Sequence, residues 1–166
     1  EAKAKVALMH TCLQHLEKEN PLRTLSLNPV EQQSAKEFGL LSSKPILYVA
    51  NVDETDLSGA GKFVEDVKHL AKDGGAEVVP VCAKLEAEIA ELDEPDRQEM
   101  LSDVGLKEPA LAVLARAAYK TLGLQSYFTA GEKEGRAWTI PLGSMAPEAA
   151  GVIHTDFEKG FIRAEI

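Results

Sequence analysis

Lys44-Pro45-Ile46-Leu47-Tyr48-Val49-Ala50-Asn51 is the stretch that decides the fold. It is a continuous apolar run rich in β-forming residues, which is typical of a strand buried on both faces of a parallel sheet. Residues 60–73 are predicted to form a helix that Gly74-Gly75 ends, and residues 77–82 to form a second strand. Strand, helix and strand in this order predict a βαβ unit within an α/β fold.

The segments on either side of this unit are predicted to be helical, and the last part of the chain changes character. Before the unit we expect helices at 1–19 and, capped by Asn28, up to Phe38; after it, at 84–92, 95–104 and 108–122. Two apolar stripes are predicted to face the core: Val6, Leu8, Met9, Leu13 and Leu16 in the first helix, and Leu111, Leu114, Ala115, Ala118, Tyr119 and Leu122 in the last.

Beyond Gly123 the pattern predicts a small α+β module, β-grasp-like, with strands at 125–131, 136–143 and 160–166 and a helix at 146–152. We place the boundary near Leu124. The first residues are charged and lack a Met, and the last ones (Phe-Ile-Arg-Ala-Glu-Ile) alternate in polarity. Both ends therefore look cut through secondary structure, and we expect the chain to be a piece of something longer.

The composition excludes several classes of protein. With 45% hydrophobic and 27% charged residues the chain is expected to be globular, and a formal charge of −9 argues against general binding to nucleic-acid backbones. The two cysteines form no CxxC or other metal-ligand spacing, which fits a reduced cytoplasmic protein without disulfides. No apolar run reaches the roughly 18 residues that a membrane span needs, so no membrane partner is expected.

Polar residues follow the first predicted strand in Asn51-Val52-Asp53-Glu54, and Val81-Cys82-Ala83-Lys84 ends the second. Ligands of open α/β sheets bind outside the carboxyl ends of the strands. An Asn there offers a donor and an acceptor to a purine edge, and a small residue lets backbone N–H groups approach a base. The two strand ends therefore predict one base pocket.

The same residues carry a resemblance to a known family. Residues 46–54 and 78–93 resemble the late G domain of the YchF branch of Obg-family P-loop NTPases. The resemblance implies that Asn51, Val52, Glu54, Cys82 and Ala83 contact the nucleotide base. Asn-x-x-Glu stands where GTPases have Asn-Lys-x-Asp, whose Asp binds guanine, so the resemblance implies ATP, with GTP as a second possible ligand, together with Mg²⁺.

Residues 124–166 resemble most of the TGS domain of the same proteins, in a truncated form, through Leu124-Gln125-Ser126-Tyr127-Phe128-Thr129-Ala130-Gly131, Arg136-Ala137-Trp138-Thr139-Ile140 and the segment from Ala150 to Ala164. TGS domains are β-grasp modules linked to RNA and ribosome contact. Because residues 124–166 carry four bases against six acids, an RNA patch rests on resemblance alone; its candidates are Lys133, Arg136, Lys159 and Arg163. Residues 1–40 resemble the return helix of the family's coiled-coil arm, and 41–123 the C-terminal part of its G domain.

Simpler readings stand beside these functional ones. Asn51 and Glu54 could form a turn after a strand, Cys82 could be a packed small side chain, and Lys84 a surface residue. His10, Cys12 and His15 lie on different helix faces, so no metal site is predicted. For His154, in His154-Thr155-Asp156, a capping role is favoured over catalysis.

No catalytic residue is predicted, because the chain has no Gly-x4-Gly-Lys-Ser/Thr loop to hold phosphates. The expectation is therefore part of a ribosome-associated ATPase that contacts the large subunit, with the chain alone inactive. The alternative is a module that binds RNA or the ribosome without nucleotide chemistry.

Overall fold

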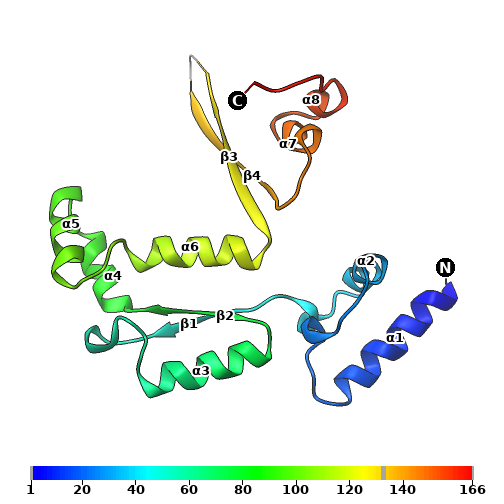
Figure 1. Cartoon of the computed structure of the whole chain (residues 1–166), viewed down its shortest axis with the longest axis horizontal. Coiled ribbons are helices and arrows are strands. Elements are labelled where there is room, and N and C mark those ends of the chain that lie inside the picture. The colour runs from blue at the N-terminus through cyan, green and yellow to red at the C-terminus, as the bar shows by residue number, and fades with distance from the viewer. Residues whose placement is uncertain (1, 132–133, 166) are drawn as a thin grey trace. The chain divides into compact units, whose positions relative to one another are not determined.

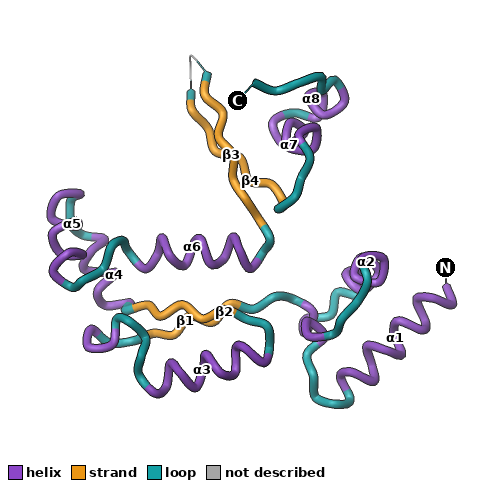
Figure 2. Tube along the Cα trace, viewed as in Figure 1, coloured by secondary structure: helices purple, strands orange, loops and turns teal. Residues whose placement is uncertain are grey.

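The computed structural model describes residues 2–131 and 134–165 (Figures 1 and 2). Two compact units make up the chain, Glu1–Leu114 and Ala115–Ile166. The first contains α1 (Ala2–Leu16), α2 (Pro29–Glu37), β1 (Leu47–Asn51), α3 (Lys62–Asp73), β2 (Glu77–Val81), α4 (Ala83–Ala90) and α5 (Glu94–Asp103), with short 3₁₀ turns at η1 (Leu22–Thr24), η2 (Leu41–Ser43) and η3 (Glu54–Asp56). α6 (Ala110–Thr121) runs across the boundary, and β3 (Leu124–Ala130), β4 (Gly135–Pro141), α7 (Ala146–Ile153) and α8 (Thr155–Lys159) follow.

The predicted βαβ unit is confirmed. β1 and β2 pair in parallel, from Leu47 opposite Glu77 to Asn51 opposite Val81, and α3 packs against both strands. The expectation that β1 is buried on both faces is wrong, because Val49 is 51% exposed. Among the described residues β1 pairs with β2 only, so its second edge lacks the neighbouring strand that burial would need.

Two apolar clusters form the core of the first unit. One joins α1 to the segment after it through the buried residues Leu8, Cys12, Leu22 and Ala35. The other lies under the end of β2 and consists of Cys82, Leu85, Ile89 and Leu101, with Val52 and Leu57 packed against it. Both cysteines are buried and free, so Cys82 has the packed position that the sequence left open.

The two apolar stripes are only partly correct. In α1 the buried residues are Leu8 and Cys12, while Val6, Met9, Leu13 and Leu16 are exposed. In α6 no residue is buried; Leu111 in the helix and Leu122 directly after it are 68% and 61% exposed. The periodicity predicted the helices correctly, but most of the side chains in the two stripes are not buried.

The second unit is built on an antiparallel pair, β3 with β4, in which Tyr127 lies opposite Trp138. The Tyr127 hydroxyl donates to the carbonyl of Ala149 (2.8 Å) and so attaches α7 to the pair. The capping role of His154 is confirmed, because its Nδ1 accepts from the backbone N–H of Asp156 (3.2 Å) at the start of α8. The strand predicted at 160–166 is wrong for residues 160–165, which pair with no described strand and leave Ile162 91% exposed.

Candidate functional site

A pocket of about 280 Å³ lies where β1 and β2 end. Its lining consists of Asn51, Val52, Asp53, Glu54, Thr55, Cys82 and Lys84. Four of the five residues predicted to contact a base therefore line one pocket. The fifth, Ala83, donates a backbone hydrogen bond to the side chain of Asn51. Small-molecule sites have volumes of about 300–1,000 Å³, so a pocket of this size suits a single flat ring system better than a whole nucleotide.

Asn51 ties the two strand ends together. Its Oδ1 accepts a hydrogen bond from the backbone N–H of Ala83 (3.2 Å), and the neighbouring Val52 N–H donates to the carbonyl of Val81 (2.9 Å). These two bonds fix the loop after β1 against the start of α4. The bond from Ala83 uses one of the two lone pairs of the amide oxygen, and the Nδ2 amino group remains to donate to a ligand.

Asp53 is turned toward its own loop. Its carboxylate accepts from the backbone N–H of Thr55 (2.8 Å) and from the Thr55 hydroxyl. The hydroxyl bond first, and then the backbone bonds, hold the pKa of Asp53 below its usual value of 3.8. A carboxylate that is engaged in this way caps η3 and is not directed at a base.

Glu54 and Lys84 form an ion pair that joins the two loops around the pocket. Lys84 Nζ lies 2.8 Å from Glu54 Oε1 and 3.9 Å from Glu88 Oε1. The hydrogen bond to Glu54, and the charges of Glu54 and Glu88, raise the pKa of Lys84 above its usual value. Lys84 was predicted from the sequence to lie at the surface, and its side chain is 71% exposed; its contact with Glu54 was not predicted. A signal was available, since a cation in the first turn of a helix is opposed by the helix dipole and needs an acidic partner.

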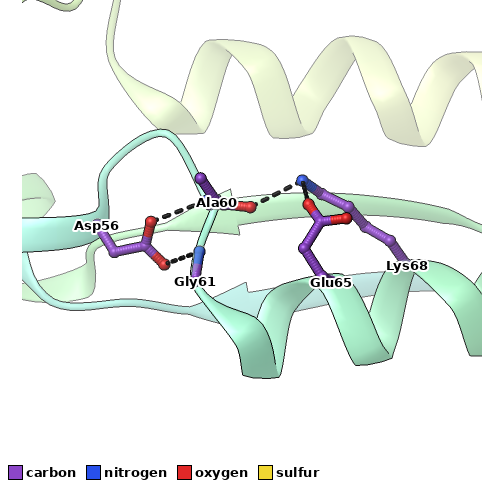
Figure 3. Close-up of polar contacts among 6 residues, drawn as sticks. Asp56, Ala60, Gly61, Glu65 and Lys68 are labelled. Atoms are coloured by element: carbon purple, nitrogen blue, oxygen red, sulfur yellow. Dashed lines mark hydrogen bonds and ion pairs between the residues drawn. The ribbon is translucent and has the colours of Figure 1, made fainter.

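The rest of the loop after β1 is held by its own side chains (Figure 3). Asp56 accepts from the backbone N–H groups of Ala60 (2.8 Å) and Gly61 (2.9 Å). Lys68 donates to the carbonyl of Gly59 (2.7 Å) and pairs with Glu65 (2.7 Å). The sequence Gly59-Ala60-Gly61-Lys62 leads into α3. Its backbone N–H groups, which in a phosphate loop would bind an anion, are bound here by the Asp56 carboxylate.

The basic candidates of the second unit lie on different elements. Arg136 stacks over the ring of Trp138 (4.2 Å to the ring centroid), and Trp138 Nε1 donates to the hydroxyl of Thr129 (2.9 Å). Arg163 lies 3.5 Å from Glu165, and Lys159 is exposed at the end of α8. Lys133 lies outside the described residues. Arg136 with Trp138 is thus a cation–π pair on β4.

Residues 2–131 and 134–165 contain neither a cluster of metal ligands nor a membrane-spanning helix. No three His, Cys, Asp or Glu side chains in these ranges gather in a way that could hold a metal ion. Within the same ranges no helix is both long and apolar enough to cross a membrane.

The fold and pocket define a two-part protein: an α/β unit with a ligand-sized pocket at its strand ends, followed by an α+β unit. A family model named YchF-GTPase_C, described as a protein of unknown function, matches residues 124–166. Over 165 residues the chain is 50% identical to the "Ribosome-binding ATPase YchF" of Escherichia coli O157:H7, covering 99% of this chain and 45% of that protein. The protein of the same name from Bacillus subtilis is 48% identical over 151 residues, 90% of this chain and 41% of that one.

A solved structure described as the YchF GTPase of Schizosaccharomyces pombe matches with a TM-score of 0.85 at 32% identity, over 96% of this chain and 43% of that chain. The chain belongs to the YchF family. It spans less than half the length of these relatives. Their names differ in the nucleotide, since the bacterial proteins are called ATPases and the fission yeast protein a GTPase.

Proposed function

We propose that this chain supplies the base-recognition edge of a nucleotide site in a ribosome-associated ATPase. The observation that carries the proposal is the pocket at the ends of β1 and β2, which gathers Asn51, Val52, Glu54 and Cys82 from two segments about 30 residues apart. Parallel α/β sheets bind ligands at this edge. The names of the bacterial relatives add the expectation of ATP hydrolysis and ribosome binding.

The chemistry of the pocket suits a purine. The free Nδ2 group of Asn51 can donate to a ring nitrogen, Val52 offers an apolar surface, and Ala83 and Cys82 leave room for a flat ring beside the backbone. Phosphate binding is a separate matter, because the 166 residues contain no Gly-x4-Gly-Lys-Ser/Thr sequence. The proposal therefore assigns the phosphates and Mg²⁺ to residues of the whole protein outside this chain, and expects the chain alone to hydrolyse no ATP.

The test is ATP affinity of the full-length protein with changes at Asn51. Asn51→Ala removes both the tie to Ala83 and the amino donor, whereas Asn51→Asp keeps an acceptor for the Ala83 N–H, removes the donor and adds a negative charge. We expect both variants to lose about three- to tenfold in ATP affinity, as for one hydrogen bond to a ligand. Asn28→Asp is the matched control, because Asp caps α2 as well as Asn does and lies away from the pocket.

Titration calorimetry with a non-hydrolysable ATP analogue gives the affinities of the wild type and of the three variants directly. If Asn51→Asp binds the analogue as tightly as the wild type, Asn51 is a structural tie and the assignment of base contact is wrong.

The alternative is that the second unit binds RNA or the ribosome and that no nucleotide chemistry takes place. The Arg136–Trp138 pair favours a role for this unit in contact with a polar partner, since the guanidinium lies over the ring, 4.2 Å from its centroid, and its N–H groups can still donate to a partner. We therefore propose that the ribosome contact of the whole protein includes β4, within the module that we assign to residues 124–166. Co-sedimentation with ribosomes should fall in Arg136→Glu and Arg163→Glu without a change in ATP affinity; unchanged co-sedimentation in both would remove these residues from the contact.

A further inference from the structure

We infer that Lys84 is a specificity-determining residue of the pocket, which disfavours guanine by holding the Glu54 carboxylate. The inference rests on the base site proposed above. Its basis is the ion pair between Lys84 Nζ and Glu54 Oε1 (2.8 Å), which links α4 to η3 across the residues that line the pocket. Both side chains line that pocket, so a base entering it meets the pair and not an isolated carboxylate.

The position of Lys84 is unfavourable unless it has an acidic partner. Lys84 lies in the first turn of α4, where the helix dipole repels a cation. Its contact with Glu88 is longer, 3.9 Å, and places the lysine N-terminal to the acid, which is the weaker order for a helical pair. Glu54 is therefore the main partner that stabilises the ammonium group at this place.

Glu54 is itself held where Lys84 can reach it. It opens η3, which Asp53 caps through Thr55, and Asp56 at the other end of η3 binds the amides of Ala60 and Gly61 (Figure 3). The ion pair thus joins two segments whose backbones are fixed. A fixed pair loses less side-chain freedom on forming than a pair between mobile loops.

The consequence for a purine follows from its hydrogen-bonding edge. Guanine presents two neighbouring N–H donors, which a free carboxylate binds with both oxygens. Adenine presents an amino donor beside a ring nitrogen acceptor. The lone pair of this nitrogen and a free carboxylate oxygen repel each other. With Glu54 Oε1 shared with Lys84 and the charge of the carboxylate balanced, the two-oxygen contact with guanine is weakened. The nearby ammonium group offers donors to an acceptor, so the neutral pair tolerates adenine.

The test compares adenine with guanine nucleotides in the full-length protein. Dissociation constants of fluorescent ADP and GDP are measured for the wild type, Lys84→Met, Glu54→Gln and the double variant. Lys84→Met should lower the ratio of ADP to GDP affinity about two- to fivefold, the range typical of an exposed ion pair. In the Glu54→Gln background the same change should leave the ratio within about 1.5-fold, because no carboxylate remains to be released.

Lys62→Met is the matched control, since Lys62 also begins a helix but does not line the pocket. Raising the salt concentration should move the wild-type ratio toward that of Lys84→Met and leave the variant unchanged, because salt screens the pair and the phosphate term cancels in the ratio. If Lys84→Met leaves the ratio of ADP to GDP affinity unchanged, or shifts it equally in the wild-type and Glu54→Gln backgrounds, the proposed role of Lys84 is wrong. The base site would not be affected by that result. Wild-type protein that binds neither nucleotide would overturn the base site as well.

Discussion

Replacing Gly59 by Ala tests how tightly the loop after β1 is packed against the sheet. Gly59 has a φ of +63°, and an added Cβ would lie 2.8 and 2.9 Å from two atoms of the Pro80 ring and 3.3 Å from Val64 Cγ1. Gly75 is a matched control, because its φ is +66° and an added Cβ would meet nothing within 4 Å. The two substitutions share the backbone strain and differ in the contact with β2.

The magnitudes separate the two effects. A left-handed backbone costs an Ala about 1–2 kcal/mol, which both variants incur. Overpacking a filled site adds about 1–3 kcal/mol, which only Gly59→Ala incurs, since Pro80 is part of a strand and Val64 part of a helix core. Gly59→Ala is therefore expected to lose about 2–5 kcal/mol of unfolding free energy in all, and Gly75→Ala about 1–2 kcal/mol.

Urea unfolding followed by far-UV circular dichroism measures both values. Trp138, the only tryptophan, lies in the second unit, so its fluorescence does not follow the unit that contains the substitutions. Equal unfolding free energies for the two variants would refute the reasoning, because the contact with Pro80 would then add nothing to the backbone strain.

Two further outcomes are expected. Leu101 is 1% exposed in the cluster under the pocket, so Leu101→Ala should lower the unfolding free energy by about 2–5 kcal/mol, whereas Leu41→Ala, at a side chain 80% exposed, should change it by less than about 0.5 kcal/mol in the same urea experiment. Thr55→Val removes the hydroxyl donor of Asp53 and should raise its lowered pKa toward 3.8, as followed by ¹³C NMR of the carboxyl group. Because that pKa is lower in the folded state, the stability that Asp53 adds is present above pH 3.8, is lost as the pH falls below it, and should be smaller in Thr55→Val.

The sequence predicted helices, strands and caps correctly where they depend on residues close together in the chain. The apolar run at 46–50, the cap at Asn28 and the His154-Thr155-Asp156 turn are local patterns, and each has the predicted structure. Burial of Leu111 and the strand at 160–166 were wrong for one reason: an apolar face or an alternating segment reveals what could pack or pair, but not whether a partner is present. A strand exists only through its neighbour.

The same distinction applies to the site. The approach of Asn51 to Ala83 could be predicted because the carboxyl ends of neighbouring parallel strands share one edge. For the ion pair of Glu54 with Lys84, the sequence indicates only that a lysine in the first turn of a helix favours an acidic partner. That this partner is Glu54, 30 residues away, depends on how η3 and α4 direct their side chains. The sequence pattern thus predicts the backbone topology, whereas the ion pair at the edge of the pocket is known only from the three-dimensional structure.

The pocket is in turn only as well defined as the register of β1 with β2. Asn51 lies opposite Val81, and this pairing allows its side chain to reach the Ala83 N–H. A shift by one residue would turn Asn51 to the other face of the sheet and separate it from α4. With two paired strands, the register depends on the packing of α3, on the Asn51 tie and on the cluster around Leu101 that anchors α4 and α5. Changes that loosen this cluster should therefore weaken base binding even though none of its side chains except Cys82 lines the pocket.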